Sequence, residues 1–300
     1  MKVLSCFDGI SCAQVALERA NVKVEKYYAS EVDKYAISIT QKNYPNTIQV
    51  GSIVDLHISE PIDLLCGGSP CQDLSIAKKN REGLNGSRSG LFWEFVRLIK
   101  EIRPKYFILE NVASMKKEEK EKMSNALSMV EPIMINAALV SAQSRKRLFW
   151  IGKLIANTYI TVGISLPVDK KIYLKDILEK EVSKKYFVNA RFTFVDIEMI
   201  DYSRPIRLGI INKGGQGERI YSIYGKSVTL SANGGGRGAK TGLYMLNDEK
   251  IRRLTPIECE RLQSLPDNYT EGISETQRYK VLGNAFNVEV VTHIFRELFL

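Results

Sequence analysis

The chain has 300 residues and carries 43 Lys and Arg against 34 Asp and Glu, a formal net charge of +9. Its 44% hydrophobic and 26% charged residues are typical of a globular protein and exclude general disorder. No apolar stretch approaches the ~18 residues of a membrane span. Two histidines and five cysteines without a C-x-x-C pair argue against a metal site or a disulfide framework. We therefore expect a cytoplasmic, metal-free protein with one large and one small domain.

Short apolar runs alternate with helical patterns in the first half of the chain. The predicted strands cover residues 3–7, 27–30, 63–68 and 106–110. The predicted helices cover residues 13–20, 33–43 and 91–102. This alternation favours an α/β fold with a doubly wound, mostly parallel sheet. Because ligands bind beyond the carboxyl ends of such strands, the polar residues to consider are Asp8, Glu31, Cys71 and Glu110.

The composition changes after about residue 165. Residues 201–245 contain ten of the 21 glycines, with seven basic and two acidic residues, so this stretch carries +5 of the net charge. Its apolar runs predict a small, basic, mostly β domain. The predicted division is a main domain at 1–164, a small domain at 165–250 and a C-terminal segment at 251–300 that returns to the main domain. The basic charge permits a polyanionic partner.

A cysteine at the tip of a tight turn is the first candidate for chemistry. Residues 67–72 read Gly-Gly-Ser-Pro-Cys-Gln and follow a predicted strand. A nucleophilic cysteine must lose its proton, and the nearby cations Lys78, Lys79 and Arg81 would favour the thiolate of Cys71. The alternative is a buried cysteine that acts as a small hydrophobe.

Two further motifs carry charged side chains. Glu110-Asn111-Val112 ends the fourth strand, where a carboxylate can contact a ring nitrogen, act as a general acid or simply cap a helix. Arg145 and Arg147 alternate on an extended segment, which predicts that both point to one side. Two guanidinium groups together suit phosphate or carboxylate recognition, although a solvated edge strand has the same pattern.

In this order and spacing, Gly-x-Pro-Cys-Gln, Glu-Asn-Val and Gln-x-Arg-x-Arg resemble the DNA cytosine-5 methyltransferase family. Phe7-Asp8-Gly9 resembles the family's first cofactor loop, and residues 253–259 and 283–286 resemble its last two motifs. The resemblance covers residues 1–153 and about 250–300. It leans toward the de novo animal enzymes and toward short bacterial or phage members.

The resemblance implies a Rossmann-like methyltransferase domain that binds S-adenosylmethionine, and a target-recognition domain. Glu31 would accept hydrogen bonds from the ribose, and Phe7 would pack against the cofactor. The full set of cofactor-binding positions implied is Phe7, Gly9, Ile10, Ser11, Glu31, Val32, Ser52, Ile53, Pro70, Asn284 and Ala285.

Four positions depart from the commonest family pattern. Ser11 and Cys12 stand where many members have paired glycines, and Ser5 replaces a frequent aspartate. Ser52 stands where many members have an aspartate that bonds the adenine amine, and its hydroxyl can still accept one hydrogen bond.

The family's chemistry assigns roles to the charged motifs. The target cytosine is flipped out of the duplex, and Cys71 adds to its C6 atom. Glu110 would share a proton with N3, and Arg145 would donate to O2 as negative charge develops. Arg147 would orient the cysteine loop or a phosphate. The implied partner is double-stranded DNA, with a restriction endonuclease as a further partner and a monomeric state typical of the family.

Basic residues outside these motifs are candidates for DNA contact. A glycine-hinged loop at residues 75–90 carries Lys78, Lys79, Arg81 and Arg88, and we expect it to close over DNA. Arg237 lies among glycines and would read a base edge, fill the space of the flipped base or contact phosphates only. Two alternatives remain open: a tRNA cytosine-5 methyltransferase on the same frame, and a catalytically inactive DNA-binding homologue.

Overall fold

The computed structural model describes residues 1–70, 84, 86, 89–196, 200–232, 237–248 and 250–299, which form two compact units. Unit 1 comprises Met1–Ile135, Lys146–Leu166 and Val291–Leu300. Unit 2 comprises Asn136–Arg145 and Pro167–Val290. Among the described residues, no helix is both long and apolar enough to cross a membrane.

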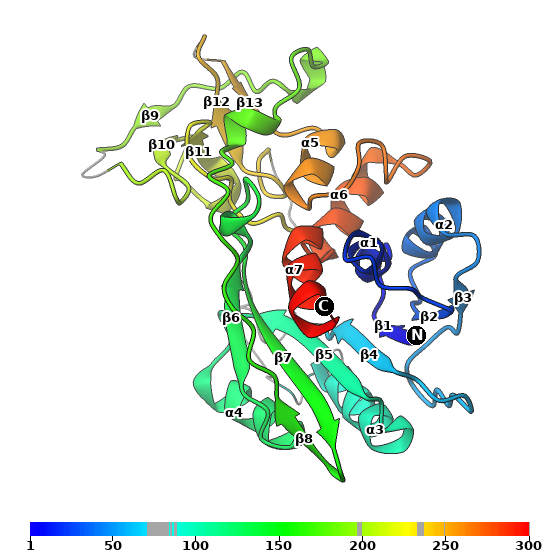
Figure 1. The fold of residues 1–300 in the computed structure, drawn as a ribbon. Helices are drawn as coiled ribbons and strands as arrows, with labels where there is room; N and C mark the ends of the chain where they lie inside the picture. Colours follow the sequence, from blue (N-terminus) through cyan, green and yellow to red (C-terminus); the bar gives the residue numbers. More distant parts are fainter. Residues whose placement is uncertain are drawn as a thin grey trace. The chain divides into compact units, whose positions relative to one another are not determined.

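The larger sheet has eight strands in the order β3-β2-β1-β4-β5-β7-β6, with β8 paired to β7 (Figure 1). Strands β1 to β5 pair in parallel, whereas β7 runs antiparallel to β5 and β8. The bounds are β1 Lys2–Cys6, β2 Lys26–Ser30, β3 Ile48–Gln49, β4 Leu64–Gly68, β5 Tyr106–Val112, β6 Pro132–Asn136, β7 Lys146–Ile155 and β8 Thr158–Thr161.

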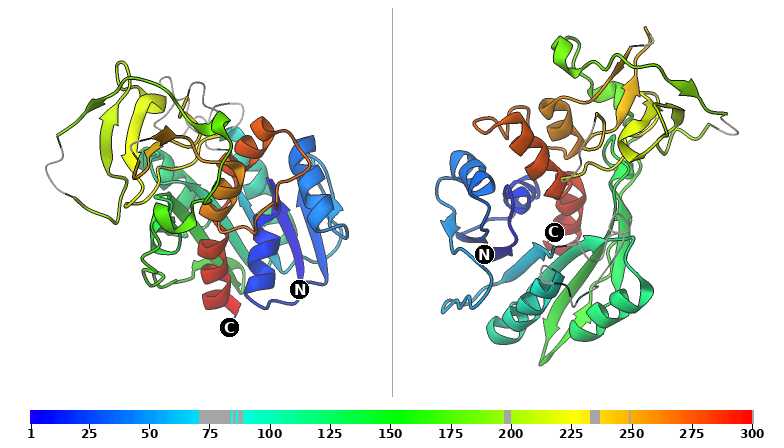
Figure 2. Two further views of the ribbon diagram at one scale, coloured as in Figure 1. Left: turned by 90° about the horizontal axis from the view of Figure 1, so that it is seen from above. Right: turned by 180° about the vertical axis from the view of Figure 1, so that it is seen from behind.

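Helices cover both faces of this sheet, with α1 and α2 on one face and α3 and α4 on the other (Figures 1 and 2). Strands β2 and β3 lie on one side of β1, and β4 and β5 lie on the other. Because each crossover is right-handed, the connecting helices of the two halves cover opposite faces. The bounds are α1 Cys12–Arg19, α2 Lys34–Asn43, α3 Phe92–Ile102, α4 Lys117–Ala126 and α7 Val288–Phe299. The predicted α/β fold with a doubly wound, mostly parallel sheet is confirmed.

Helix α3 illustrates how the apolar pattern builds the core of unit 1. Phe92, Phe95, Val96 and Ile99 recur at helical spacing and are all buried. They pack in one cluster with Phe107, Leu109 and Trp150 of the sheet. The helix ends at Arg103, which adopts a left-handed φ of 52° directly before Pro104. A buried apolar sheet of this kind fixes the positions of its strand ends.

Unit 2 contains a smaller five-stranded sheet in the order β13-β12-β11-β10-β9. Its apolar cluster consists of Ile211, Ile220, Leu243 and Ile251. The bounds are β9 Thr193–Phe194, β10 Arg207–Ile210, β11 Arg219–Ser222, β12 Leu243–Met245, β13 Ile251–Arg252, α5 Pro256–Leu262 and α6 Glu275–Asn284. Short 3-10 turns occur at Ser89–Leu91, Ala137–Leu139, Leu174–Ile177, Lys184–Tyr186 and Gln216–Glu218.

The division into units differs from the predicted domains at two places. The first predicted boundary, after residue 164, lies close to the observed one after Leu166, but residues 136–145 belong to unit 2. Of the predicted returning segment 251–300, only Val291–Leu300 belongs to unit 1. The reason is local bonding: the side-chain amide of Gln263 donates to the carbonyls of Leu282 and Ala285, which ties α6 to α5.

Candidate active site

The carboxyl ends of β1, β2, β4 and β5 lie at one edge of the parallel sheet, as parallel pairing requires. Asp8 follows β1, Glu31 follows β2, and Ser69 and Pro70 follow β4. Glu110 pairs with Gly68, the last residue of β4. The sheet therefore brings the predicted strand-end residues of unit 1 to the same edge.

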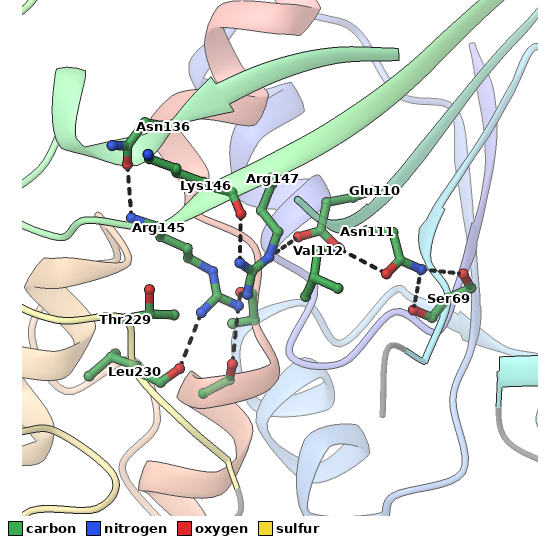
Figure 3. A network of polar contacts seen from close by, with 12 residues as sticks. Ser69, Glu110, Asn111, Val112, Asn136, Arg145, Lys146, Arg147, Thr229 and Leu230 are labelled. Carbon is green, nitrogen blue, oxygen red and sulfur yellow. Dashed lines mark hydrogen bonds and ion pairs between the residues drawn. The ribbon is translucent and has the colours of Figure 1, made fainter. Parts of the chain in front are cut away.

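Glu110 forms an ion pair with Arg147 near this edge (Figure 3). The Nε atom of Arg147 lies 2.7 Å from Oε1 of Glu110, and the two side chains are only 15% and 12% exposed. Antiparallel pairing of β5 with β7 sets this contact, because Val112 and Arg147 are opposite residues. The carboxylate is thus held in a fixed direction with part of its surface open.

Asn111 links the strand that carries Glu110 to the loop that leads to Cys71. This fully buried amide donates to the carbonyl and the hydroxyl oxygen of Ser69, at 3.3 and 3.0 Å (Figure 3). Its own oxygen accepts from the backbone N–H of Val112. Asn111 was not among the predicted site residues, although the Glu-Asn-Val motif itself was the signal for it.

Arg145 has partners that differ from those of Arg147, and three of them lie in unit 2. Arg145 is 3% exposed, and its guanidinium group donates to the backbone carbonyls of Leu230, Gly283 and Ala285, at 3.4, 3.1 and 2.9 Å. The boundary between the units falls between Arg145 and Lys146. The two arginines thus bond to different groups, and the prediction that both point to one side stays a prediction.

The loop after β1 and the residue after β2 are bonded to each other. The backbone N–H of Gly9 donates to Oε2 of Glu31 at 2.8 Å. The other carboxylate oxygen of Glu31 accepts from the N–H groups of Val32 and Asp33. Gly9 and Gly51 have positive φ angles of 61° and 74°, and a Cβ atom added to either would meet no atom within 4 Å. Both loops therefore border open space.

The residues beside the Gly9 and Gly51 loops include both apolar and polar groups. Val32 is 72% exposed, Phe7 is partly buried and Ile53 is buried. The Ser52 hydroxyl accepts from the N–H of Val54 at 3.1 Å, and it still has a proton to donate. An apolar flank, a carboxylate and free hydroxyl capacity fit a nucleoside with its ribose.

Asp8 is a buried carboxyl in the same loop. Burial raises its pKa to about 6, although hydrogen bonds from Ser11, Tyr27 and Ser5 act in the opposite direction. The nearby Glu31 charge raises the pKa further. Ile10 and Ser11, two of the predicted cofactor residues, are both buried beside it.

Several predicted residues lie outside the described part of the chain: Cys71, Lys78, Lys79, Arg81 and Arg88. Pro70 is described and partly buried. Asn284 is exposed at the end of α6, and Ala285 caps that helix inside unit 2. Their predicted contact with a cofactor stays a prediction.

A polar cavity of about 390 Å³ lies within unit 2. Its lining includes Gln216, Arg219, Tyr221 and Thr229. Arg219 is partly buried and donates to the carbonyl of Gly214 at 3.3 Å. Arg237, the residue predicted to contact DNA, is exposed and follows residues 233–236, which lie outside the described residues. Gln216 and Arg219 were not among the predicted site residues, although both lie in the glycine-rich basic stretch 201–245.

The family model for C-5 cytosine-specific DNA methylases matches residues 1–300. The chain therefore belongs to this family, and the resemblance inferred from its motifs is confirmed. It is a DNA cytosine-5 methyltransferase.

Similar proteins support this assignment. The type II methyltransferase M.HhaI of Haemophilus parahaemolyticus is 33% identical, over 98% of this chain and 93% of that protein. The type II methyltransferase M.HpaII of Haemophilus parainfluenzae is 28% identical, over 96% and 86% of the two chains. In fold, the chain is similar to the Dnmt2 methyltransferase of S. pombe, with a TM-score of 0.69, 18% identity and coverage of 98% and 96%.

Proposed function

We propose that the protein transfers a methyl group from S-adenosylmethionine to C5 of a cytosine in a specific duplex DNA sequence. The observation that carries the proposal is the Glu110–Arg147 ion pair at the carboxyl end of β5. It lies beside the end of β4, where Asn111 fixes Ser69 two residues before Cys71. Addition to a cytosine ring requires a nucleophile, here Cys71, next to a carboxylate held in a fixed position, here Glu110.

The residues after β1 and β2 fit the cofactor. Glu31 has about one acceptor position left for a ribose hydroxyl, because a carboxylate accepts about four hydrogen bonds and three backbone N–H groups already use it. Val32, Ile53 and Phe7 provide apolar contact for the adenine ring. When bound, S-adenosylmethionine supplies the electrophilic methyl group.

The protein's own groups perform the remaining steps. The Cys71 thiolate forms a bond to C6 of a flipped-out cytosine, which makes C5 nucleophilic. A proton held between Glu110 and N3 moves toward N3 as the ring gains electron density. After methylation, C5 loses its proton to a base, the Cys71–C6 bond breaks and the electron pair returns to sulfur. An ordered water molecule is our candidate for that base.

The contacts of the two arginines favour an exchange of their predicted roles. Arg147 touches the carboxylate of Glu110, so it is the better candidate to donate to the cytosine O2. Arg145 is committed to three backbone carbonyls, so we assign it to holding residues 230 and 283–285 together.

Unit 2 is our candidate for reading the DNA sequence. Its basic, glycine-rich segment supports this role, and the polar cavity places Arg219 among groups that suit a base edge. Arginine to guanine is the commonest specific base contact. Arg237 is exposed, so it is equally suited to a phosphate. We propose that the enzyme acts as a monomer and that a restriction endonuclease of the same specificity accompanies it.

Transfer of a labelled methyl group to unmethylated duplex DNA and to tRNA tests the substrate. We expect product on DNA only, with bisulfite sequencing placing the mark at cytosines in one sequence context. Cys71→Ser is expected to abolish turnover, whereas Cys259→Ala, which changes a buried cysteine of α5, is expected to retain it. Transfer to tRNA alone would favour the tRNA alternative. Cofactor binding without product on either would favour the inactive homologue.

A further inference from the structure

The loop between β1 and α1 has an unusual backbone. Phe7, Gly9 and Ser11 have positive φ angles of 55°, 61° and 56°. Glycine adopts this left-handed region freely, but for phenylalanine and serine it is strained. Contacts must therefore hold the two non-glycine residues in place.

The side chain of Ser11 provides one of these contacts. Ser11 stands at the N-cap of α1, where a serine hydroxyl normally accepts from a helix N–H. Here it makes no such bond. Instead, it donates to Oδ2 of Asp8 and contacts the Thr40 hydroxyl oxygen at 3.1 Å. Its hydrogen-bonding capacity is thus directed into the loop rather than into the helix.

Asp8 is bound from two sides. Its Oδ2 atom accepts from Ser11, and its Oδ1 atom accepts from the Tyr27 hydroxyl of β2 at 2.6 Å. The Asp8 side chain is buried, and burying a carboxyl group is unfavourable. The carboxyl therefore joins the strained end of the loop to the neighbouring strand.

The segment that this contact fixes borders open space. The Gly9 N–H is bonded to Glu31, and the Gly9 carbonyl accepts from the Thr40 hydroxyl at 3.4 Å. A Cβ atom added to Gly9 would meet no atom within 4 Å. Moving Ser11 out of its left-handed conformation would shift the backbone of residues 9–11, of which Gly9 borders this space.

We propose that Asp8 is a positioning residue for S-adenosylmethionine: through Ser11 it holds the backbone of residues 9–11 in the conformation that receives the cofactor. This inference rests on the proposed function. It also explains how a serine can stand where many family members have glycine: the Asp8–Ser11 hydrogen bond replaces the conformational freedom of glycine.

Binding of tritiated S-adenosylmethionine to the full chain, measured by equilibrium dialysis without DNA, tests the proposal. Asp8→Asn is expected to weaken binding about tenfold or more, because it removes a buried, charge-assisted hydrogen bond. Ser11→Gly removes the strain together with the hydroxyl. In that background, Asp8→Asn is expected to have little further effect.

A matched control is Asp63→Asn. Asp63 accepts from the Lys2 N–H at 2.7 Å, at the opposite end of β1, and its change should leave affinity intact. In the methylation assay, Asp8→Asn should raise the KM for the cofactor with kcat at saturation nearly unchanged. A purely structural role of Asp8 would not raise KM while leaving kcat nearly unchanged.

A second pair of variants decides the question if Asp8→Asn does not fold. Ser11→Ala keeps the strain and loses the hydroxyl, so it should bind about tenfold more weakly than Ser11→Gly. Equal affinities for this pair would overturn the inference. So would Asp8→Asn with wild-type affinity, or with the same loss in both backgrounds. If wild type itself binds no cofactor, the proposed function fails first.

Discussion

The two units are stabilised in different ways. Unit 1 has a large cluster of buried apolar side chains, among them Phe92, Phe107 and Trp150, and charged groups such as Glu31 and Glu110 lie at its strand ends. Unit 2 also buries apolar side chains, among them Leu243, Leu254 and Leu262, but in addition it keeps charged groups inside. Arg252 and Glu258, for example, form a bidentate pair with side chains 2% and 0% exposed. The Glu110–Arg147 pair of unit 1 is thus partly exposed at a strand end, whereas the Arg252–Glu258 pair of unit 2 is buried and holds the structure.

The difference predicts that equivalent substitutions have different consequences. A buried ion pair adds little to stability compared with apolar packing, but removing one partner leaves an uncompensated charge. A partly exposed ion pair at a strand end contributes little to stability. Substitutions in the interior of unit 2 should therefore affect folding, and those at the strand ends of unit 1 should affect turnover.

The largest effect is expected for Glu258→Ala. It leaves the Arg252 guanidinium buried without its carboxylate, so we expect a loss of about 3–5 kcal/mol in the free energy of unfolding. Urea denaturation measures this. The double variant Arg252→Met with Glu258→Leu should recover much of the loss. A loss below about 1 kcal/mol for Glu258→Ala would break the distinction between the units.

Asp8 is the exception that sharpens the comparison, since it is a buried carboxyl in the apolar unit. Its pKa is raised to about 6 from an ordinary value of 3.8, so the folded protein holds this proton more tightly than the unfolded chain. The contribution of Asp8 to stability is therefore greatest below pH ~4 and falls as the pH rises through about 6, by about 3 kcal/mol in total.

Asp8→Asn isolates this effect. Urea denaturation of wild type and variant between pH 4 and 7 should show a difference in stability that shifts across this range in favour of the variant. Other groups that titrate here cancel in the difference. A constant difference would contradict the raised pKa.

The two arginines allow the same substitution to be compared across the units. Arg147→Lys should lower kcat by about 10- to 100-fold with little change in Tm, because lysine cannot reproduce the fixed guanidinium contact with Glu110. Arg145→Lys should instead lower stability by about 2 kcal/mol, because buried carbonyls lose their donors. If both variants lose mainly activity, the exchange of roles between Arg145 and Arg147 would be contradicted.

The smallest effect is expected for Asp248→Ala in unit 2. Asp248 pairs with Lys250 at 2.6 Å, but both side chains are more than half exposed. Such exposed pairs contribute little to stability, so the urea midpoint should barely move. A large loss would mean that charge in unit 2, and not its burial, determines stability.

Much of unit 1 could be predicted from the sequence because its signals are local. The apolar runs at 3–7, 63–68 and 106–110 correspond to β1, β4 and β5. Parallel pairing then brings Asp8, Glu31 and Glu110 to one edge without further information. The contact of Glu110 with Arg147 was missed because it depends on the register of the antiparallel β7, which no local pattern specifies.

Unit 2 was predicted less well because long-range polar bonds determine it. Residues 227–230 have a strand-like pattern but do not join the sheet. Ser227 forms an isolated β-bridge with Gln143, and the Leu230 N–H donates a hydrogen bond to the Gln143 side chain. The role of Ser11 was missed for a related reason, since its left-handed backbone and its bond to Asp8 are visible only in three dimensions.

The central claim is that Cys71 forms a covalent bond to the target cytosine, and trapping that bond tests it most directly. In duplex DNA with 5-fluorocytosine at the target position, fluorine replaces the proton that must leave C5, so the adduct cannot resolve. With S-adenosylmethionine present, we predict a stable protein–DNA complex whose cross-linked peptide contains Cys71. Cys259→Ala should form it and Cys71→Ser should not. A methylating enzyme that forms no complex, or a cross-link at another residue, would contradict the account.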